Sequence, residues 1–132
     1  MESLEKSARQ ISDAEWKVMH ALWKGGRLSS NDVVADVVPE TGWSPNTVRT
    51  LLNRLTDKGV LRADKERGTE KEYPLCFYTP LYTRAECEAV HVQSFLEKVF
   101  EGDPSRLLSH FVRETSLTPE QIAELRKQLE EI

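Results

Sequence analysis

Apolar residues recur at helical spacing through most of this chain, and the clearest stripe lies within residues 43–59. Four aliphatic side chains there follow the i, i+3, i+4, i+7 spacing of a helix that packs one face on a core: Val48, Leu51, Leu52 and Leu55. Ser44-Pro45 in front of the stripe is an N-cap followed by proline at the first helical position, and Gly59 behind it is a C-terminal cap. The pattern predicts one amphipathic helix between these signals.

Two shorter helices are predicted before this one. The first, about 12–24, begins with the capping box Ser12-Asp13-Ala14-Glu15. Its apolar positions are Trp16, Val18, Met19, Leu22 and Trp23. The second, about 29–38, packs four valines, which are Val33, Val34, Val37 and Val38. Valines also suit a strand because β-branching lowers helix propensity, but a serine cap in front and Pro39 behind favour a helix.

A β-hairpin is predicted next, from residues 60–65 and 73–79 with a charged turn around Gly68. Pro74 limits its part of the second strand to a sheet edge or to the strand's start. Residues 27–29 are a candidate for a short extra strand between the first two helices. Three helices followed by a hairpin is the order of a winged helix-turn-helix, so the fold class predicted is mainly α.

The pattern becomes helical again after Thr83, with helices expected over about 83–100 and after Asp103-Pro104 and Thr118-Pro119. These helices carry too many large apolar residues for isolated rods and too few for an independent core. We therefore predict a winged-helix domain over 1–82 and a small α-helical dimerisation region over 83–132. The residues expected to pack against a second copy of the chain are Phe95, Val99, Phe100, Leu107, Leu108, Phe111, Val112, Ile122, Leu125 and Leu129.

The polar face of the third helix carries amide, hydroxyl and cationic groups, which can read base edges and grip phosphates. Three short side chains near its N-terminus are the candidates for base edges: Asn46, Thr47 and Thr50. Arg49 can reach either a guanine or a phosphate, and Arg54 and Lys58 are expected to hold the DNA backbone. The alternative is an ordinary solvated helix face.

The predicted hairpin adds further cations that suit phosphate or minor-groove contacts: Lys65, Arg67 and Lys71. Three glutamates dilute this charge, which are Glu66, Glu70 and Glu72. A solvated hairpin is therefore an equally weighted interpretation of the wing.

The formal net charge of the 132-residue chain is −4, which is unusual for a nucleic-acid binder, so the distribution of charge matters. Residues 81–132 hold six Lys/Arg against ten Asp/Glu, whereas residues 43–71 hold seven against four. Positive charge is thus concentrated around the third helix and the hairpin. This asymmetry favours a DNA-binding module with a separate assembly module, and dispersed surface charge is the alternative.

Length and composition exclude several classes of protein. No apolar run approaches the ~18 residues that span a bilayer, and residues 1–10 lack the apolar segment of a signal peptide. Two cysteines, Cys76 and Cys87, are too few for a disulfide framework and fit a reducing compartment. We expect a cytoplasmic protein without membrane insertion.

The sequence does not predict an enzyme or a cofactor. Its three histidines lie on separate predicted helices, without a glycine-rich phosphate loop or a nucleophile elbow. Cys87 and His91 are four residues apart on one predicted helix, so both can face a single metal. Two ligands do not make a site, and we predict no metal; a metal-responsive regulator using this pair stays as an alternative.

Several blocks of the sequence together resemble the penicillinase-repressor family of bacterial transcriptional regulators, the BlaI/MecI/CopY type. The blocks that carry the resemblance are residues 12–19, Leu22-Trp23, residues 43–55, Lys58-Gly59, Phe77-Tyr78-Thr79-Pro80, and residues 117–125. The resemblance covers nearly the whole chain. It implies a sequence-specific repressor that binds a palindromic double-stranded operator as a homodimer, with N-terminal winged helices and C-terminal dimerisation helices.

The resemblance also bears on how such a repressor is released from DNA. In this family release follows either proteolysis within the C-terminal helices, with a membrane-bound sensor protease as a possible partner, or metal exchange at a cysteine cluster. The position matching the family's Asn-Phe scissile pair is His110-Phe111 here. This chain has no cysteine after Cys87, which argues against a copper-responsive member. A protein–protein module built on the same fold is the remaining alternative.

Overall fold

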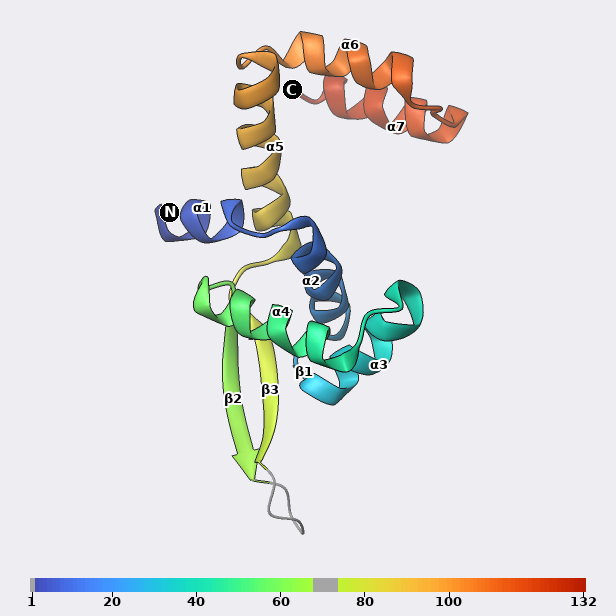
Figure 1. The fold of residues 1–132 in the computed structure, drawn as a ribbon. Coiled ribbons are helices and arrows are strands. Elements are labelled where there is room, and N and C mark those ends of the chain that lie inside the picture. The colour runs from blue at the N-terminus through green and yellow to red at the C-terminus, as the bar shows by residue number, and fades with distance from the viewer. Residues whose placement is uncertain (1, 68–73) are drawn as a thin grey trace. The chain divides into compact units, whose positions relative to one another are not determined.

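The computed structural model describes residues 2–67 and 74–132, which form a mainly α-helical chain with one small sheet (Figure 1). By compactness the chain divides into two units, Met1–Val92 and Gln93–Ile132. The helix α5 (Arg84–Phe100) crosses this division. Its first turns belong to the first unit because Cys87 is fully buried in that unit's core and Val90 packs against it.

The first unit contains the predicted winged helix. Its helices before the hairpin are α1 (Glu2–Arg9), α2 (Asp13–Gly25), α3 (Ser30–Thr41) and α4 (Pro45–Asp57). Its strands are β1 (Leu28–Ser29), β2 (Leu61–Arg67) and β3 (Pro74–Pro80), in one antiparallel sheet of order β1-β3-β2. The fold class predicted from the sequence, a winged helix-turn-helix, is confirmed.

Helix starts agree closely with the cap signals in the sequence. In the capping box of α2, Ser12 Oγ accepts the Glu15 N–H at 3.2 Å, and the Glu15 carboxylate accepts the Ser12 N–H at 2.8 Å. Ser29 and Asp32 form the same reciprocal pair at the start of α3. These bonds satisfy backbone donors that have no partner within the helix.

The end of α3 was predicted wrongly. The helix does not stop before Pro39 but continues through it to Thr41, where Gly42 in the left-handed region closes it with φ 73°. Proline is tolerated there because only one late intrahelical bond is lost, and the residue is exposed at the helix surface. The Thr41 hydroxyl also donates to the Val37 carbonyl at 2.9 Å, which ties down the final turn.

The helix α1 was not predicted. Its apolar content is small, and its packing is visible only in three dimensions: Leu4 is partly buried against the core and Ala8 is fully buried. Leu4 and Ala8 are four residues apart, so they lie on one face of α1, and this short face packs on the core.

The core of the first unit is formed mainly by α2, α3, α4 and the strands beside them. Its fully or almost fully buried apolar members include Val18, Met19, Leu22, Val33, Val37, Val48, Leu51, Leu52, Leu55, Val60 and Leu61. Trp16 and Trp23 pack against this core but stay partly exposed. The Trp23 indole N–H donates to the Tyr82 carbonyl at 2.9 Å, which satisfies its polar end.

The predicted hairpin forms with β2 and β3 paired from Leu61 opposite Pro80 to Arg67 opposite Pro74. Pro74 is the first residue of β3, as the sequence indicated. The short strand β1 pairs Leu28 with Tyr78 on the other side of β3, so the predicted extra strand is also confirmed. The hairpin follows directly on the C-terminal end of α4 (Figure 1).

The second unit contains the end of α5 together with α6 (Pro104–Glu114) and α7 (Pro119–Glu130). Asp103 caps α6, and Thr118 forms a capping box with Gln121 at the start of α7, as predicted. Within the described residues, no helix combines the length and the apolar character that crossing a membrane requires.

Candidate nucleic-acid interface

Capping interactions between neighbouring residues define both ends of helix α4. At its start Ser44 Oγ accepts the Thr47 N–H at 3.1 Å. At its end Val60 N–H donates to the Leu55 carbonyl and Gly59 N–H to the Thr56 carbonyl, which is a Schellman cap with Gly59 at φ 80°. The predicted start and the predicted glycine cap are both confirmed.

The two faces of α4 differ sharply in exposure. The apolar stripe predicted from the sequence is between 0% and 5% exposed: Val48, Leu51, Leu52 and Leu55. The predicted contacts on the opposite side are all exposed, and they are Asn46, Thr47, Arg49, Thr50 and Arg54. One helix therefore presents amide, hydroxyl and guanidinium groups to solvent on a rigid, buried support, which is the geometry that groove reading requires.

Arg49 lies at the margin of this face that is nearest to α3. Its Nη2 donates to the Oδ1 of Asn31 in the first turn of α3, at 3.2 Å, and both side chains are exposed. Since residues are about 100° apart around a helix, Arg49 stands well off the centre of the face marked by Asn46 and Thr50. Asn31 was not predicted as part of the interface, because its partner Arg49 is 18 positions away in the chain.

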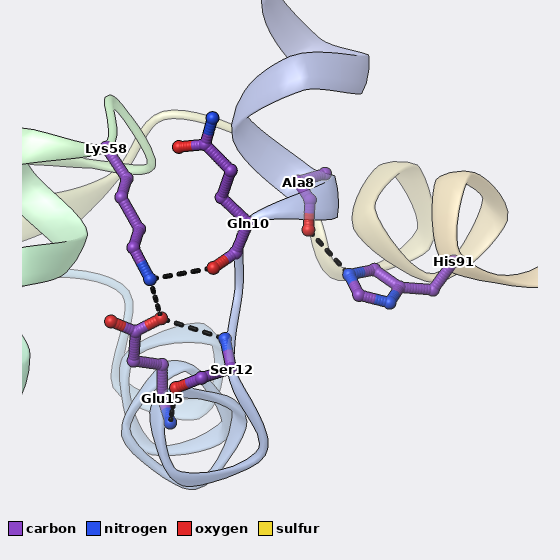
Figure 2. Close-up of polar contacts among 6 residues, drawn as sticks. All are labelled: Ala8, Gln10, Ser12, Glu15, Lys58 and His91. Carbon is purple, nitrogen blue, oxygen red and sulfur yellow. Dashed lines mark hydrogen bonds and ion pairs between the residues drawn. The ribbon is translucent and has the colours of Figure 1, made fainter. Parts of the chain in front are cut away.

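The Lys58 side chain, predicted to hold the DNA backbone, makes contacts within the protein. Its ammonium donates to the Gln10 carbonyl at 2.7 Å and to Oε1 of Glu15 at 2.5 Å (Figure 2). The side chain is only 27% exposed, and the Glu15 side chain is 1% exposed. The ammonium of this lysine is therefore bonded to partners inside the first unit.

The surroundings of the Glu15 carboxylate favour its ionised form. Burial raises the pKa of Glu15, but the hydrogen bonds from Lys58 and the Ser12 backbone, with the Lys58 charge, outweigh that effect and leave it below the ordinary value. Glu15 is therefore an ionised acid in the interior, held by two donors on one oxygen. Such a group is stable only while its partners stay in place.

A polar contact also joins the hairpin to α4. The Tyr78 hydroxyl in β3 donates to Oδ1 of Asn53 on α4 at 3.4 Å, and the tyrosine is 5% exposed. Burial, followed by the hydrogen bond and charge of Cys76, raises the pKa of Tyr78 to about 12. The hydroxyl therefore stays protonated and able to donate at neutral pH.

Only part of the predicted wing contact can be located. Lys65 lies in β2 opposite Cys76 and is exposed, as a backbone contact requires. Arg67 is the last residue of β2, but its side chain, like the whole of Lys71, lies outside the described residues. Nearby, Arg62 is paired with Asp64 at 3.1 Å, so its charge is partly compensated.

Cys87 and His91, the two residues considered as metal ligands, are both in contact with other parts of the first unit. Cys87 is fully buried, and desolvation, with smaller effects of Glu86 and Glu88, raises the pKa of its thiol to about 11. A ring nitrogen of His91, Nε2, faces the Ala8 carbonyl at 2.5 Å (Figure 2). The ring also packs edge-on against Trp16. Across residues 2–67 and 74–132 there is no group of three or more His, Cys, Asp and Glu placed to hold a metal.

The second unit carries an apolar surface on its two last helices. An open groove of about 610 Å³ is lined by residues of α6 and α7, among them Leu108, Phe111, Val112, Ile122, Leu125 and Leu129. These side chains are 36–60% exposed, as are Phe95 and Val99 on α5. Of the other predicted dimerisation residues, Phe100 packs on Phe95 and His110 and is partly buried, as is Leu107.

Known proteins match the chain over nearly its whole length. The family model described as Penicillinase repressor matches residues 11–131. The penicillinase repressor of Bacillus licheniformis is 34% identical over 126 residues, covering 96% of this chain and 94% of that protein. The methicillin resistance regulatory protein MecI of Staphylococcus aureus (strain N315) is 29% identical over 123 residues, covering 93% and 95%.

Among solved structures, wild-type MarR from E. coli in its apo form aligns with a TM-score of 0.51 at 15% identity, covering 97% of this chain and 84% of that one. This likeness concerns the fold alone. The family match covers both units, and the relatives are spanned almost completely. The chain belongs to the penicillinase repressor family.

Proposed function

We propose that two copies of this chain bind double-stranded operator DNA together and repress transcription from the promoter that they occupy. Repression is the function named for the family and for the Bacillus licheniformis relative, and MecI is named as a regulatory protein. One structural observation carries the DNA contact: the predicted base-reading residues Asn46, Thr47 and Thr50 are exposed on a helix whose opposite face is buried. A protein with this function acts in the cytoplasm.

Within this proposal each part of the first unit has its own role. The helix α4 enters a major groove, where its N-terminal side chains meet base edges, and Arg49 and Arg54 hold the phosphates on either side. Lys65, Arg67 and Lys71 of the wing add backbone contacts. These sequence-independent contacts supply much of the affinity, so binding weakens as salt rises.

The homodimer is supported by the exposed apolar side chains of the second unit. Large side chains such as Phe111 and Leu125 line an open groove in the single chain. Covering them with a second copy removes apolar area from water, at roughly 25 cal/mol per Å². Two-fold symmetry of the protein then requires an approximately palindromic operator, with half-site centres about 34–36 Å apart or a multiple of that spacing.

Selection of bound duplexes from a random pool tests the proposal directly. We expect enrichment of an inverted repeat and saturable binding of two chains for each enriched duplex, measured by mobility shift and sedimentation. Binding without sequence preference would leave only the phosphate contacts. No saturable binding at low salt would favour a protein–protein module on the same fold.

For release from DNA we propose loss of the dimer, by cleavage at His110-Phe111 or by another inducing signal. His110 and Phe111 lie inside α6, and Phe111 lines the apolar groove. A cut there separates α7 from the rest of the chain and dismantles the groove. A membrane-bound sensor protease is the partner that this route requires. Because a protease needs an extended substrate, α6 has to unfold locally first.

A further inference from the structure

We infer that Glu15 and Lys58 are a positioning pair that fixes the recognition helix α4 against α2, and that Lys58 acts through this pair rather than on DNA phosphate. The inference rests on the proposed DNA-binding function and extends it to a buried carboxylate outside the interface. The observation behind it is that the start of α2 and the end of α4, which are 43 positions apart in the sequence, meet at one carboxylate oxygen.

The geometry of the junction is specific. Oε1 of Glu15 accepts both the Ser12 N–H, at 2.8 Å, and the Lys58 ammonium, at 2.5 Å. The same ammonium donates to the Gln10 carbonyl at 2.7 Å, so it bridges the α1–α2 connection and the first turn of α2 (Figure 2). Charge-assisted hydrogen bonds of this length are roughly twice as strong as neutral ones.

Lys58 is the C-cap residue of α4, so the junction fixes the end of α4 that leads into the wing. Lys58 also places a cationic residue at the C-terminus of α4, where the helix dipole favours positive charge. Gly59, the next residue, has its α-carbon close to Ser7: a Cβ added to it would stand 3.2 Å from Ser7 Oγ. The end of α4 is thus packed and bonded to the α1–α2 segment within a few ångströms.

A fixed helix end matters more for base reading than for phosphate contact. Base-edge hydrogen bonds need side chains held within about 0.5 Å of their productive positions. Long arginine and lysine side chains can follow a phosphate through a larger displacement. Loosening the junction should therefore reduce preference for the operator while leaving binding to random DNA and its salt dependence nearly unchanged.

The test uses the full chain and two probes, a duplex selected from a random pool by the wild-type protein and a random-sequence duplex of equal length. For Lys58→Met we expect the affinity for the selected duplex to fall about tenfold, within the range of coupled neighbours. The affinity for the random duplex should change less than twofold, with the same salt slope. Glu15→Gln should act in the same direction, and the double variant should be no weaker than the weaker single variant.

If Lys58 instead contacts a DNA phosphate, the two variants should affect binding differently. In that case Lys58→Met lowers both affinities in parallel and reduces the salt slope by about one per chain. Glu15→Gln then frees the ammonium and leaves binding unchanged or tighter. Either result overturns the positioning role, and so does an unchanged affinity of both variants for the selected duplex.

General destabilisation is the remaining explanation, and Cys87→Ala is the matched control because Cys87 is fully buried in the same unit. Binding is measured at a temperature where every variant is folded by circular dichroism. An equal loss of operator preference in Cys87→Ala would sink the inference. If the wild-type chain itself selects no preferred duplex, the proposed function fails and the inference fails with it.

Discussion

Thr50 and Arg54 lie one helical turn apart on the exposed face of α4, but we expect them to meet different parts of a duplex. Thr50→Ala should relax preference at one base position, by about 1 kcal/mol, because a short side chain reaches only a base edge. Arg54→Ala should weaken binding to every sequence and lower the salt slope by about one per half-site. Mobility-shift titrations at several salt concentrations separate these effects. Equal losses of Thr50→Ala on selected and random duplexes would remove Thr50 from base reading.

Arg49 and Asn31 allow a sharper test at the same scale. Their hydrogen bond fixes a guanidinium at the α3 side of the interface, where a phosphate is the expected partner. Arg49→Ala should lower affinity for selected and random duplexes alike. Asn31→Ala should lower it by less, about twofold to threefold, and should have no further effect when Arg49 is already alanine. Both residues are exposed, so thermal stability serves as the control and should not change. Independent, additive effects would show that Asn31 does not act through Arg49.

At the scale of single elements, the sequence predicted the features that depend on residues close together in the chain, such as helix caps. Ser12, Ser44 and Thr118 cap their helices as their spacing indicated, because each cap bond joins residues only three positions apart. The contact between Lys58 and Glu15 was not predicted because the two residues are 43 positions apart in the chain. Local spacing predicts which side of a helix a side chain occupies. It does not predict which buried acid that side chain meets.

The interactions of the Glu15 carboxylate should make the stability of the first unit depend on pH in the acid range. Folding lowers the pKa of Glu15 below its ordinary value of 4.5. A carboxyl of this kind contributes its full stabilisation above the unfolded pKa and loses it as the pH falls through the folded pKa. Urea unfolding of wild type and Glu15→Gln should therefore differ by a constant amount between pH 6 and 8, and the difference should shrink below about pH 4.5. A difference that does not depend on pH would mean that the charge of Glu15 contributes nothing to stability.

For the molecule as a whole, the acidic net charge is compatible with DNA binding because the charges are segregated. Residues 81–132 account for the whole net excess of acid, whereas the exposed face of α4 presents Arg49 and Arg54. The sequence predicted this division, along with the apolar character of the last helices. It did not predict that α1 packs on the core, because Leu4 and Ala8 are only two apolar positions on an otherwise polar segment, although they are four residues apart and share one helix face. Assembly is likewise a property of two chains, so pattern alone supports it but does not define its geometry.

Removing residues 111–132 tests the proposed assembly at this scale. The truncation deletes α7 and the end of α6, which together line most of the apolar groove. We expect a monomer by sedimentation, an unchanged fold of the first unit by circular dichroism, and an operator affinity lower by about 10²-fold or more, because two linked half-sites are no longer bound as one unit.

Two full-length variants show whether the lost length or the lost groove is responsible. Leu125→Asp places a charge in the groove and should reproduce the monomer, whereas Glu120→Ala changes an exposed residue of α7 outside the groove lining and should stay dimeric. A truncated chain that keeps its dimeric mass would refute assembly through this unit, and operator affinity would then have to be explained by the first unit alone.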